Sequence, residues 1–470
     1  MLDDDPTGSQ AVHGIEVVTV LQESAYQAAL DGPTGGCFVL TNTRSLAEPA
    51  AARLTRQAAR DLIAAAERRG RRIQLISRSD STLRGHLLAE VAAVQTARHD
   101  VLGRGFDGVL LIPAFPEAGR VTAGGIHWAR IGPDLVPVGE TEFARDPAFG
   151  YRSSGLREFL AERSGGAIRP EQVARISLAD IRLGGPDRVA ARLAAVSGGG
   201  WVAVDATDYA DLDIVACGVL RAERAGQAFL FRTGPSFVRA LAGQDPQAPL
   251  RGARIWPPEH GSPEHGSPEH GSPEHGSPEH GSPKHGRAGG HGLIVVGSHV
   301  GQTSRQVAAL RARPGTAALE LDVPAVLRGA DAMAAAAARQ AAAALRQSDV
   351  LLYTSRAVAT GRDPAASLAI ARTVSAALAG VVRDVLATRP PAWVIAKGGI
   401  TSHDVATRGL GIRRALVAGQ LFPGLISVFH PVDAAPAAVG LPYVVFAGNV
   451  GDDGTLAQVV DILNGEQEDG

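Results

Sequence analysis

The sequence has little of several things, and each shortage excludes a class of protein. It contains two cysteines, Cys37 and Cys217, both in apolar surroundings, which argues against a disulfide framework and for reduced core thiols. The formal net charge is −2, so there is no electrostatic basis for binding nucleic acid or an anionic membrane. No apolar run reaches the length of a membrane span, and the acidic start of the chain is unlike a secretion signal. We therefore expect a cytoplasmic protein.

Common phosphate-binding motifs are missing as well. The sequence has no GxxxxGK[ST] loop, and its GxGxxG match, GRGFDG at 103–108, precedes an expected strand instead of following one. Lysine is nearly absent, since Lys284 and Lys397 are the only two in the chain. A nucleotide site would therefore have to be built from other residues.

A low-complexity repeat divides the chain. From Pro258 the pentapeptide PEHGS recurs, and proline and glycine at this spacing prevent a regular helix or strand. We interpret the repeat as a disordered His/Pro/Gly-rich linker; the alternative is a metal-binding tract, and adventitious Ni²⁺ or Zn²⁺ binding is expected either way. The predicted parts are an N-terminal domain over 1–250, a linker over 251–290 and a C-terminal domain over 291–470. The periodic histidines are His260, His265, His270, His275, His280 and His285.

Short apolar runs alternate with helical stretches on both sides of the repeat. This alternation predicts two α/β domains with mainly parallel sheets covered by helices. Ser45 and Glu48 form a capping box that predicts the start of one long helix. The expected strands are 37–40, 72–76, 108–113, 201–206 and 228–231 in the first domain, and 292–297, 349–355, 392–398 and 443–448 in the second.

The expected strands of the second domain end in small and hydroxyl residues. The segments are GSHVGQTS (297–304), TSRAVATG (354–361), KGGITSHD (397–404) and AGNVGDDG (447–454). Ligands bind beyond the carboxyl ends of parallel strands, where glycines allow close approach and hydroxyls hold phosphate oxygens. The pattern favours a nucleotide site; the alternative is a set of ordinary turn and helix-cap residues.

The strand ends of the first domain carry charge instead. They are DDDPTGSQ (3–10), TNTRS (41–45), SRSDSTLRGH (77–86) and PAFPEAGR (113–120). Arginine forks suit a carboxylate or phosphate, and an aspartate beside a substrate hydroxyl can act as a base or hold Mg²⁺. A small anionic polyol fits this set, although a solvated helix start capped by Ser79 or Asp80 is the simpler alternative for one segment alone. An anionic-polyol site next to a nucleotide site predicts a kinase.

These motifs resemble those of the four-carbon acid sugar kinase family over nearly the whole chain. The first three segments that carry the likeness are DDDPTGSQAVHG, SRSDSTLRGH and PAFPEAGR, and the later ones are AKGGITSHDVA, GQLFPGL and LPYVVFAGNVGDD. The resemblance implies ATP- and Mg²⁺-dependent phosphorylation of the terminal hydroxyl of threonate, erythronate or a 3-oxo-tetronate. An alternative substrate is a branched acid such as 3-oxo-isoapionate.

The resemblance also assigns candidate residues by motif. Asp80 and Arg84 are the catalytic candidates; Asp80 is the favoured base, and Asp4 and Asp5 remain rivals for that role. Lys397 is either a phosphate contact or a solvated loop residue. The sugar-acid candidates are Asp4, Asp5, Arg78, Ser81 and Arg120, and the ATP candidates are Ser298, Lys397, Gly398, Gly399, Ile400, Thr401, Gly448 and Gly451.

Two departures from the family pattern leave alternatives open. Only Met1 and Leu2 precede Asp3, so we expect either that the start is placed too late or that the strand before the acidic motif is lost. His403 stands where the family often has another polar residue. A lost strand would favour a non-catalytic sugar-acid-binding protein. A metal-handling protein defined by the repeat is a further alternative. Oligomeric state is not set by the sequence, and a homodimer is the default expectation.

Overall fold

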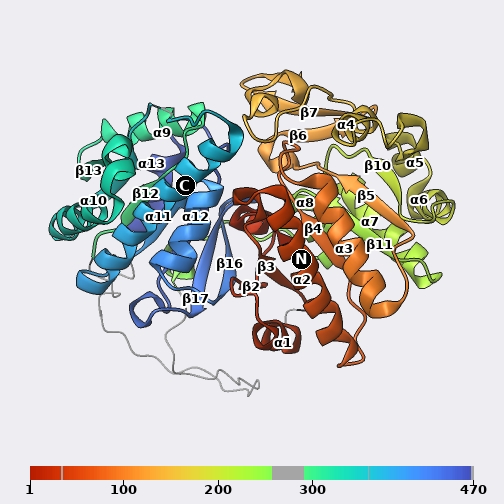
Figure 1. The fold of residues 1–470 in the computed structure, drawn as a ribbon, viewed down its shortest axis with the longest axis horizontal. Helices are drawn as coiled ribbons and strands as arrows, with labels where there is room; N and C mark the ends of the chain where they lie inside the picture. The colour runs from red at the N-terminus through yellow and green to blue at the C-terminus, as the bar shows by residue number, and fades with distance from the viewer. Residues whose placement is uncertain (33–34, 257–289, 358, 467–470) are drawn as a thin grey trace, which may run out of the picture.

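The computed structural model describes residues 1–32, 35–256, 290–357 and 359–466 (Figure 1). The six periodic histidines and Lys284 lie outside the described residues, so the predicted linker is not tested there. Described structure does continue past the expected boundary at residue 250. The 3-10 helix η7 (Gly252–Ile255) places Ile255 in the core, and its carbonyl oxygen lies 2.8 Å from Nε2 of His430.

Both domains are α/β, as predicted, and the expected strands all form. The N-terminal strands are β1 (Leu2–Asp3), β2 (Glu16–Val18), β3 (Cys37–Leu40), β4 (Leu75–Arg78), β5 (Gly108–Ile112), β9 (Ala174–Ile176), β10 (Gly200–Val204) and β11 (Phe229–Thr233). The C-terminal strands are β12 (Leu293–Val296), β13 (Thr316–Leu321), β14 (Asp349–Thr354), β15 (Val394–Lys397), β16 (Arg414–Phe422), β17 (Leu425–Asp433) and β18 (Tyr443–Phe446). A separate antiparallel sheet contains β6 (Arg120–Ala123), β7 (Ile126–Ile131) and β8 (Asp134–Pro137).

Helices cover the sheet. In the N-terminal domain they are α1 (Glu23–Asp31), α2 (Glu48–Glu67), α3 (Leu87–Leu102), α4 (Leu156–Arg163), α5 (Leu178–Arg182), α6 (Gly185–Ala194), α7 (Tyr209–Arg224) and α8 (Pro235–Ala242). In the C-terminal domain they are α9 (Gly301–Arg311), α10 (Val323–Ala344), α11 (Pro364–Thr388), α12 (Gly399–Asp404) and α13 (Thr455–Asn464).

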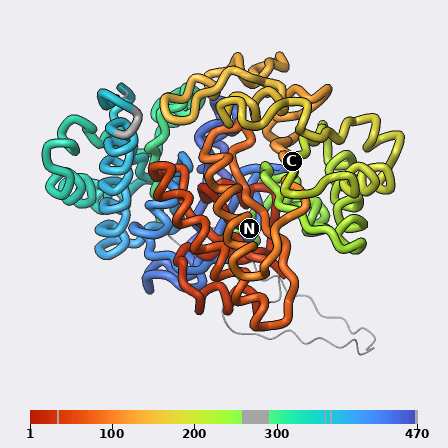
Figure 2. The backbone as a smooth tube through the Cα atoms, turned by 45° about the vertical axis from the view of Figure 1, so that its right-hand side comes forward, coloured from red at the N-terminus to blue at the C-terminus, as the bar shows by residue number. Residues whose placement is uncertain are grey.

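The strands of both domains join in one mixed, mostly parallel sheet of 15 strands. Their order is β13-β14-β12-β15-β18-β17-β16-β2-β3-β1-β4-β11-β5-β10-β9. The antiparallel hairpin β16–β17 lies between the two parallel sets, and β16 pairs antiparallel with β2. The two domains therefore share a continuous backbone hydrogen-bond network, and Figure 2 shows them side by side around this centre.

The expected loss of the first strand is wrong. Leu2 and Asp3 form a two-residue strand that pairs in parallel with β3 on one side and β4 on the other. Leu2 is buried, and Met1 donates from its amino group to the carbonyl oxygen of Cys37 at 2.7 Å. Neighbours on both sides thus hold the acidic motif that follows.

The predicted capping box is also wrong. Ser45 lies in the 3-10 helix η2 (Thr43–Ser45), where its hydroxyl donates to the carbonyl oxygen of Asn42 at 2.8 Å. Helix α2 starts three residues later, at Glu48, because Pro49 fits the first turn of a helix, where no backbone N–H is needed.

One helix is more apolar than the sequence analysis recognised. Within the described residues, Ala366–Thr388 of α11 is long and apolar enough to cross a membrane by length and composition, with a mean hydropathy of 1.3. It packs against α10, and Leu378, Val381 and Val385 are buried in the core. A core helix of a folded domain accounts for these contacts.

Candidate active site

The start of the chain lies at the junction of the two domains. After β1, Asp5 caps the 3-10 helix η1 (Pro6–Ala11), with Oδ1 accepting from the backbone N–H of Thr7 at 2.8 Å. Helix η1 packs against α8 of its own domain and against α12, β16, β17 and β18 of the other. Figure 1 shows this first segment beside α12 in the middle of the molecule. Residues at the carboxyl end of β1 therefore face the C-terminal domain.

Two arginines bind the three consecutive aspartates. Arg78, at the end of β4, pairs with Asp3 and donates from Nη2 to Oδ1 of Asp5 at 2.9 Å. Arg44 donates to both carboxylate oxygens of Asp4, at 2.8 and 3.2 Å, and pairs with Asp5 at 2.5 Å. All three carboxylates are buried, so the ion pairs are shielded from solvent.

The surroundings give the three aspartates different pKa values. Burial raises the pKa of Asp3 to about 8, against the opposing effect of Arg78. Burial also raises the pKa of Asp4, despite Arg44 and Arg78. The pKa of Asp5 is about 2, because Arg44, Arg78 and the hydrogen bonds from Thr7 outweigh its burial. Asp5 is thus a fixed negative charge with its oxygens already occupied, which makes it a poor proton acceptor.

Gly8 makes the contact between Arg78 and Asp3 possible. A Cβ at this position would lie 2.1 Å from Nε of Arg78 and 2.3 Å from Oδ2 of Asp3. Those distances are far inside van der Waals contact, and both side chains are buried with nowhere to move. The glycine of DDDPTG is therefore needed for close approach.

Asp80 and Arg84 form the second charged group. Oδ2 of Asp80 accepts from Nε of Arg84 at 2.6 Å and from the hydroxyl of Thr82, whereas Oδ1 makes no hydrogen bond to any described residue. Burial would raise the pKa of Asp80, but the charges of Arg84 and Arg44 and these hydrogen bonds hold it well below its usual range. Asp80 is therefore ionised, with one oxygen available to a ligand.

The loop that carries Asp80 is held through its backbone. The hydroxyl of Tyr151 donates to the carbonyl oxygen of Thr82 at 2.6 Å. His127 of β7 lies with Nε2 2.7 Å from the carbonyl oxygen of Ser81 and Nδ1 2.9 Å from the hydroxyl of Thr122. The small antiparallel sheet thereby fixes this loop.

Arg120 is a buried cation that reaches across the domain boundary. Its Nη2 donates to the carbonyl oxygen of Asn449 at 3.1 Å, and its buried Nε has no partner among the described residues. Burial lowers its pKa to about 10. The guanidinium groups of Arg84 and Arg120 lie 5.5 and 5.7 Å from the ring centre of Phe143. This pair of arginines around one aromatic ring is suited to a ligand carboxylate.

The loops after β12, β15 and β18 meet at Ser298. A Cβ on Gly398 would lie 3.0 Å from Cβ of Ser298, and one on Gly448 would lie 2.5 Å from its Oγ. Thr303 of α9 donates to the carbonyl oxygen of Gly448 at 2.8 Å. Glycine is needed at both positions because the backbone there packs directly against the side chain of Ser298.

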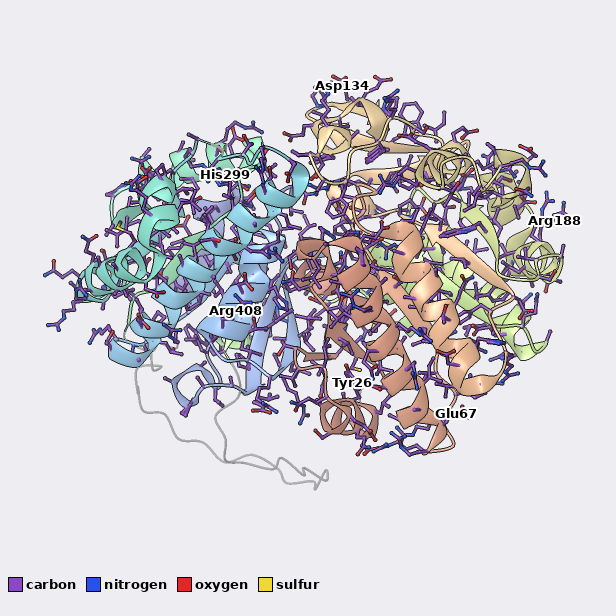
Figure 3. The ribbon with its side chains drawn as sticks, viewed as in Figure 1. Tyr26, Glu67, Asp134, Arg188, His299 and Arg408 are labelled. Carbon is purple, nitrogen blue, oxygen red and sulfur yellow. The ribbon has the colours of Figure 1, made fainter. Side chains whose placement is uncertain are left out.

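A cavity of about 280 Å³ opens beside these loops. Ser298, Gly398, Ile400 and Thr401 line it, together with Pro147 of the N-terminal domain. Figure 3 shows the neighbouring His299, another lining residue, on the C-terminal domain. An apolar wall together with hydroxyls and glycines suits a nucleoside with phosphates. Its apolar lining residues are Val323, Ala359, Ile370, Ala371, Val374 and Leu378.

The structure excludes one of the two sequence interpretations of Lys397. Its side chain is fully buried, so it is not a solvated loop residue. Its Nζ donates to the carbonyl oxygen of Ala447, in the loop after β18, at 3.0 Å and lies 3.4 Å from the ring centre of Phe446. Burial lowers its pKa well below the usual value, which favours the neutral amine. The last side chain of β15 is therefore buried against the loop after β18.

The two remaining ATP candidates, Gly399 and Gly451, lie in different places. Gly399 faces the N-terminal domain, since a Cβ there would lie 2.6 Å from Oδ2 of Asp5. Gly451, with φ +84°, packs against Thr455 at the start of α13 and does not line the cavity. Together with the contact between Arg120 and Asn449, the position of Gly399 brings the charged loops and the glycine-rich loops face to face.

Several residues that contribute to the site were not among the sequence candidates. Arg44 was noted only as a charged residue after a strand, yet it binds two of the aspartates. Arg232 of β11 is buried and donates to Ser77 at 2.7 Å and to Glu90 at 2.5 Å, beneath the aspartates. Phe143 has no sequence signal, since only the fold brings it between two arginines. Arg232 is the one of these residues that the sequence could have indicated, because a charged residue within an apolar strand is unusual.

Magnesium does not fit the aspartate cluster as it is folded. Asp3, Asp4 and Asp5 are the one group in the described chain whose carboxylate oxygens lie close enough to share an ion. Arg44 and Arg78 already occupy those oxygens, and only Oδ2 of Asp3 has no partner. The arginines perform the neutralising role that a metal would have, so we derive no step through Mg²⁺ here.

Comparison with known proteins agrees with a sugar-acid site on the N-terminal domain and a nucleotide site on the C-terminal domain. A family model described as a sugar-binding N-terminal domain matches residues 1–241, and one described as a nucleotide-binding C-terminal domain matches residues 293–456. The chain belongs to the four-carbon acid sugar kinase family. The family's two domains are the two that meet at Asp5 and Gly399.

Individual relatives are more distant. A D-threonate kinase of Salmonella typhimurium is 35% identical over 137 residues, which is 29% of each chain. A D-erythronate kinase of Heliobacterium modesticaldum is 29% identical over 261 residues, or 54% of each chain. The chain thus spans about half or less of the curated relatives it matches. A crystal structure of a Haemophilus influenzae protein, 16% identical, covers 98% of this chain and 99% of its own with a TM-score of 0.57, and shows the same fold.

Proposed function

We propose that this member of the four-carbon acid sugar kinase family transfers the terminal phosphate of ATP to the terminal hydroxyl of a four-carbon sugar acid. The observation that carries the proposal is the contact between the domains. Asp5 lies against Gly399, and Arg120 donates to Asn449. Groups suited to a sugar acid therefore sit directly opposite groups suited to nucleotide phosphates, which is the arrangement that phosphoryl transfer requires.

The cavity beside Ser298 would hold the nucleotide. Its apolar wall would bury the base, and the loops containing Gly398 and Gly448 would let the phosphates approach the backbone closely. The hydroxyls of Ser298 and Thr401, which line the cavity, would supply hydrogen bonds to the phosphates. ATP supplies the phosphoryl group; the protein supplies orientation and a site shielded from water.

The sugar acid would lie among Asp80, Arg84 and Arg120. Arg120 is buried without a carboxylate in contact, so a substrate carboxylate would compensate its charge. The free Oδ1 of Asp80 would accept a hydrogen bond from the substrate hydroxyl that attacks phosphorus. Because the pKa of Asp80 is well below its usual range, this carboxylate orients the hydroxyl and takes its proton only late in the transfer.

A coupled assay of ADP release tests the proposal. The panel contains threonate and erythronate in both enantiomers, their 3-oxo forms and 3-oxo-isoapionate, each with Mg-ATP. We expect one four-carbon acid to stimulate ADP release at least tenfold over ATP alone. Binding of that acid by calorimetry without any stimulated release would contradict the kinase proposal and support the non-catalytic alternative.

A further inference from the structure

His403 lies at the domain junction beside the proposed phosphate loop. Helix α12 starts at Gly399, the residue that faces Asp5, and packs against η1. His403 comes four residues after Gly399 and therefore lies on the same face of the helix, one turn further along. The imidazole is thus next to the point where the two domains meet.

The ring of His403 has an unsatisfied polar atom. Its Nδ1 is buried and makes no hydrogen bond to any described residue. Burial lowers the pKa of His403 to about 4; Arg408 of the π-helix η8 (Val405–Gly409) acts in the same direction, and Asp5 acts against both. Figure 3 shows Arg408 on this side of the C-terminal domain. A buried nitrogen without a partner is costly unless a ligand satisfies it.

Two basic side chains at the loops around Gly398 and Ser298 already have hydrogen-bond partners. Lys397 donates to Ala447 and is buried. Arg356 donates to the carbonyl oxygen of Ser298 at 2.8 Å and to the hydroxyl of Ser304 at 2.7 Å. The strand order β14-β12-β15 places Arg356 on the far side of Ser298 from Gly398. On the near side, among the described residues, Arg44 and Arg78 pair with Asp5 and Arg120 donates to Asn449. The imidazole of His403 is a further group there that can become positive.

We propose that the imidazole of His403 contacts the β- or γ-phosphate of the bound nucleotide and takes up a proton when that phosphate arrives. The inference rests on the proposed function, because it places the phosphates at the loop around Gly398. An arriving anion stabilises the imidazolium and opposes the effect of burial and of Arg408. His403 would then supply the charge that Lys397 does not.

Calorimetry with two nucleotides tests this inference. Binding of Mg²⁺ β,γ-imido-ATP and of AMP is measured at pH 6.5 in two buffers that differ in ionisation enthalpy. We expect wild-type protein to take up more protons than His403→Asn on binding the triphosphate, and the two to be equal with AMP. The triphosphate should bind His403→Asn roughly tenfold more weakly, the effect of one charge-assisted hydrogen bond. His99→Asn, an exposed histidine on α3, is the matched control and should behave as wild type.

Two results would overturn the inference. One is equal proton uptake by wild type and His403→Asn; the other is equal weakening of AMP and triphosphate, which indicates a merely structural role. If the variant does not fold, ¹⁵N spectra of the histidine rings in wild-type protein show whether His403 is protonated. A His403 ring that is still neutral at pH 6.5 with the triphosphate bound would contradict the proposal. Unchanged triphosphate binding by His403→Asn with normal sugar-acid turnover would remove the inference and leave the proposed function standing.

Discussion

Single side chains at the start of the chain are fixed by close packing. Gly8 has no room for a Cβ between Arg78 and Asp3, so Gly8→Ala must push two buried, paired charges apart. We expect it to lower the free energy of unfolding by about 2–4 kcal/mol, the range for breaking a buried charged network. Gly105→Ala is the matched control, because nothing lies within 4 Å of a Cβ there. Thermal unfolding of both variants checks this, and equal midpoints would contradict it.

Asp80 is the carboxylate with a free oxygen in the proposed sugar-acid site. Asp80→Asn keeps the shape but loses the negative charge that orients the substrate hydroxyl and pairs with Arg84. We expect kcat/KM for the sugar acid to fall at least a hundredfold, a typical effect of losing a general base. The nucleotide Kd should stay within twofold.

Steady-state kinetics and nucleotide titration measure both effects. Asp146→Asn is a useful comparison, because Asp146 also faces Arg84, but at 3.5 Å and half-buried. Near-normal turnover by Asp80→Asn would remove Asp80 from the proposed role and return the choice to Asp4, because burial raises the pKa of Asp4 whereas the pKa of Asp5 is about 2.

How far the sequence predicts the site depends on the residue. Motifs placed Asp80, Arg84 and Arg120 at strand ends, and the structure brings these three into one region. The same reasoning could not decide between the two interpretations of Lys397, because alternation along a strand decides which way its last side chain points, and the loop boundary cannot be known to one residue. Phe143 and Arg232 reach the site from distant strands and loops, so no local pattern could identify them.

The small antiparallel sheet holds the Asp80 loop through His127. Burial lowers the pKa of His127 to about 4 from 6.5, so between those values the unfolded chain binds a proton that the folded chain does not. Stability therefore falls as the pH falls through this window, by about 2 kcal/mol from this group at pH 5.

A comparison of variants isolates this contribution. His127→Asn should be less stable than wild type at pH 7.5, because it weakens the contacts with Ser81 and Thr122. It should also lose less stability between pH 7.5 and pH 5. His99→Asn, exposed on α3, should keep the full pH dependence. Parallel unfolding curves for wild type and His127→Asn at the two pH values would contradict this account.

Strands were predictable where they are buried on both faces. The apolar runs of β5, β12 and β18 stand out in the sequence because helices cover both sides of a parallel sheet. The hairpin β16–β17 was missed, since its residues alternate in burial along β16 and the strands run antiparallel. Strand β4 extends through Ser77 and Arg78 because β1 and β11 pair with both. Strand pairing, not residue type, sets such boundaries.

The whole molecule depends on segments that are distant in sequence. The first strands of the chain pair with the last hairpin, so the two domains form one sheet although the repeat lies between them. The sequence predicted two α/β domains but not this connection, because a pairing between β2 and β16 leaves no local pattern.

Replacing the six histidines of the repeat with alanine should abolish retention on a Ni²⁺ column and leave sugar-acid turnover unchanged. Loss of turnover would favour the metal-handling alternative.

The central claim is that the two facing sites transfer phosphate to the terminal hydroxyl of a sugar acid. Proton-coupled ³¹P NMR of the product tests it most directly. The terminal hydroxyl is on a CH₂ group, so its phosphate ester should give a triplet that grows as ATP is consumed. A doublet would mean that a secondary hydroxyl is phosphorylated, and growth of inorganic phosphate alone would mean that no sugar acid accepts the group; either result would contradict the account.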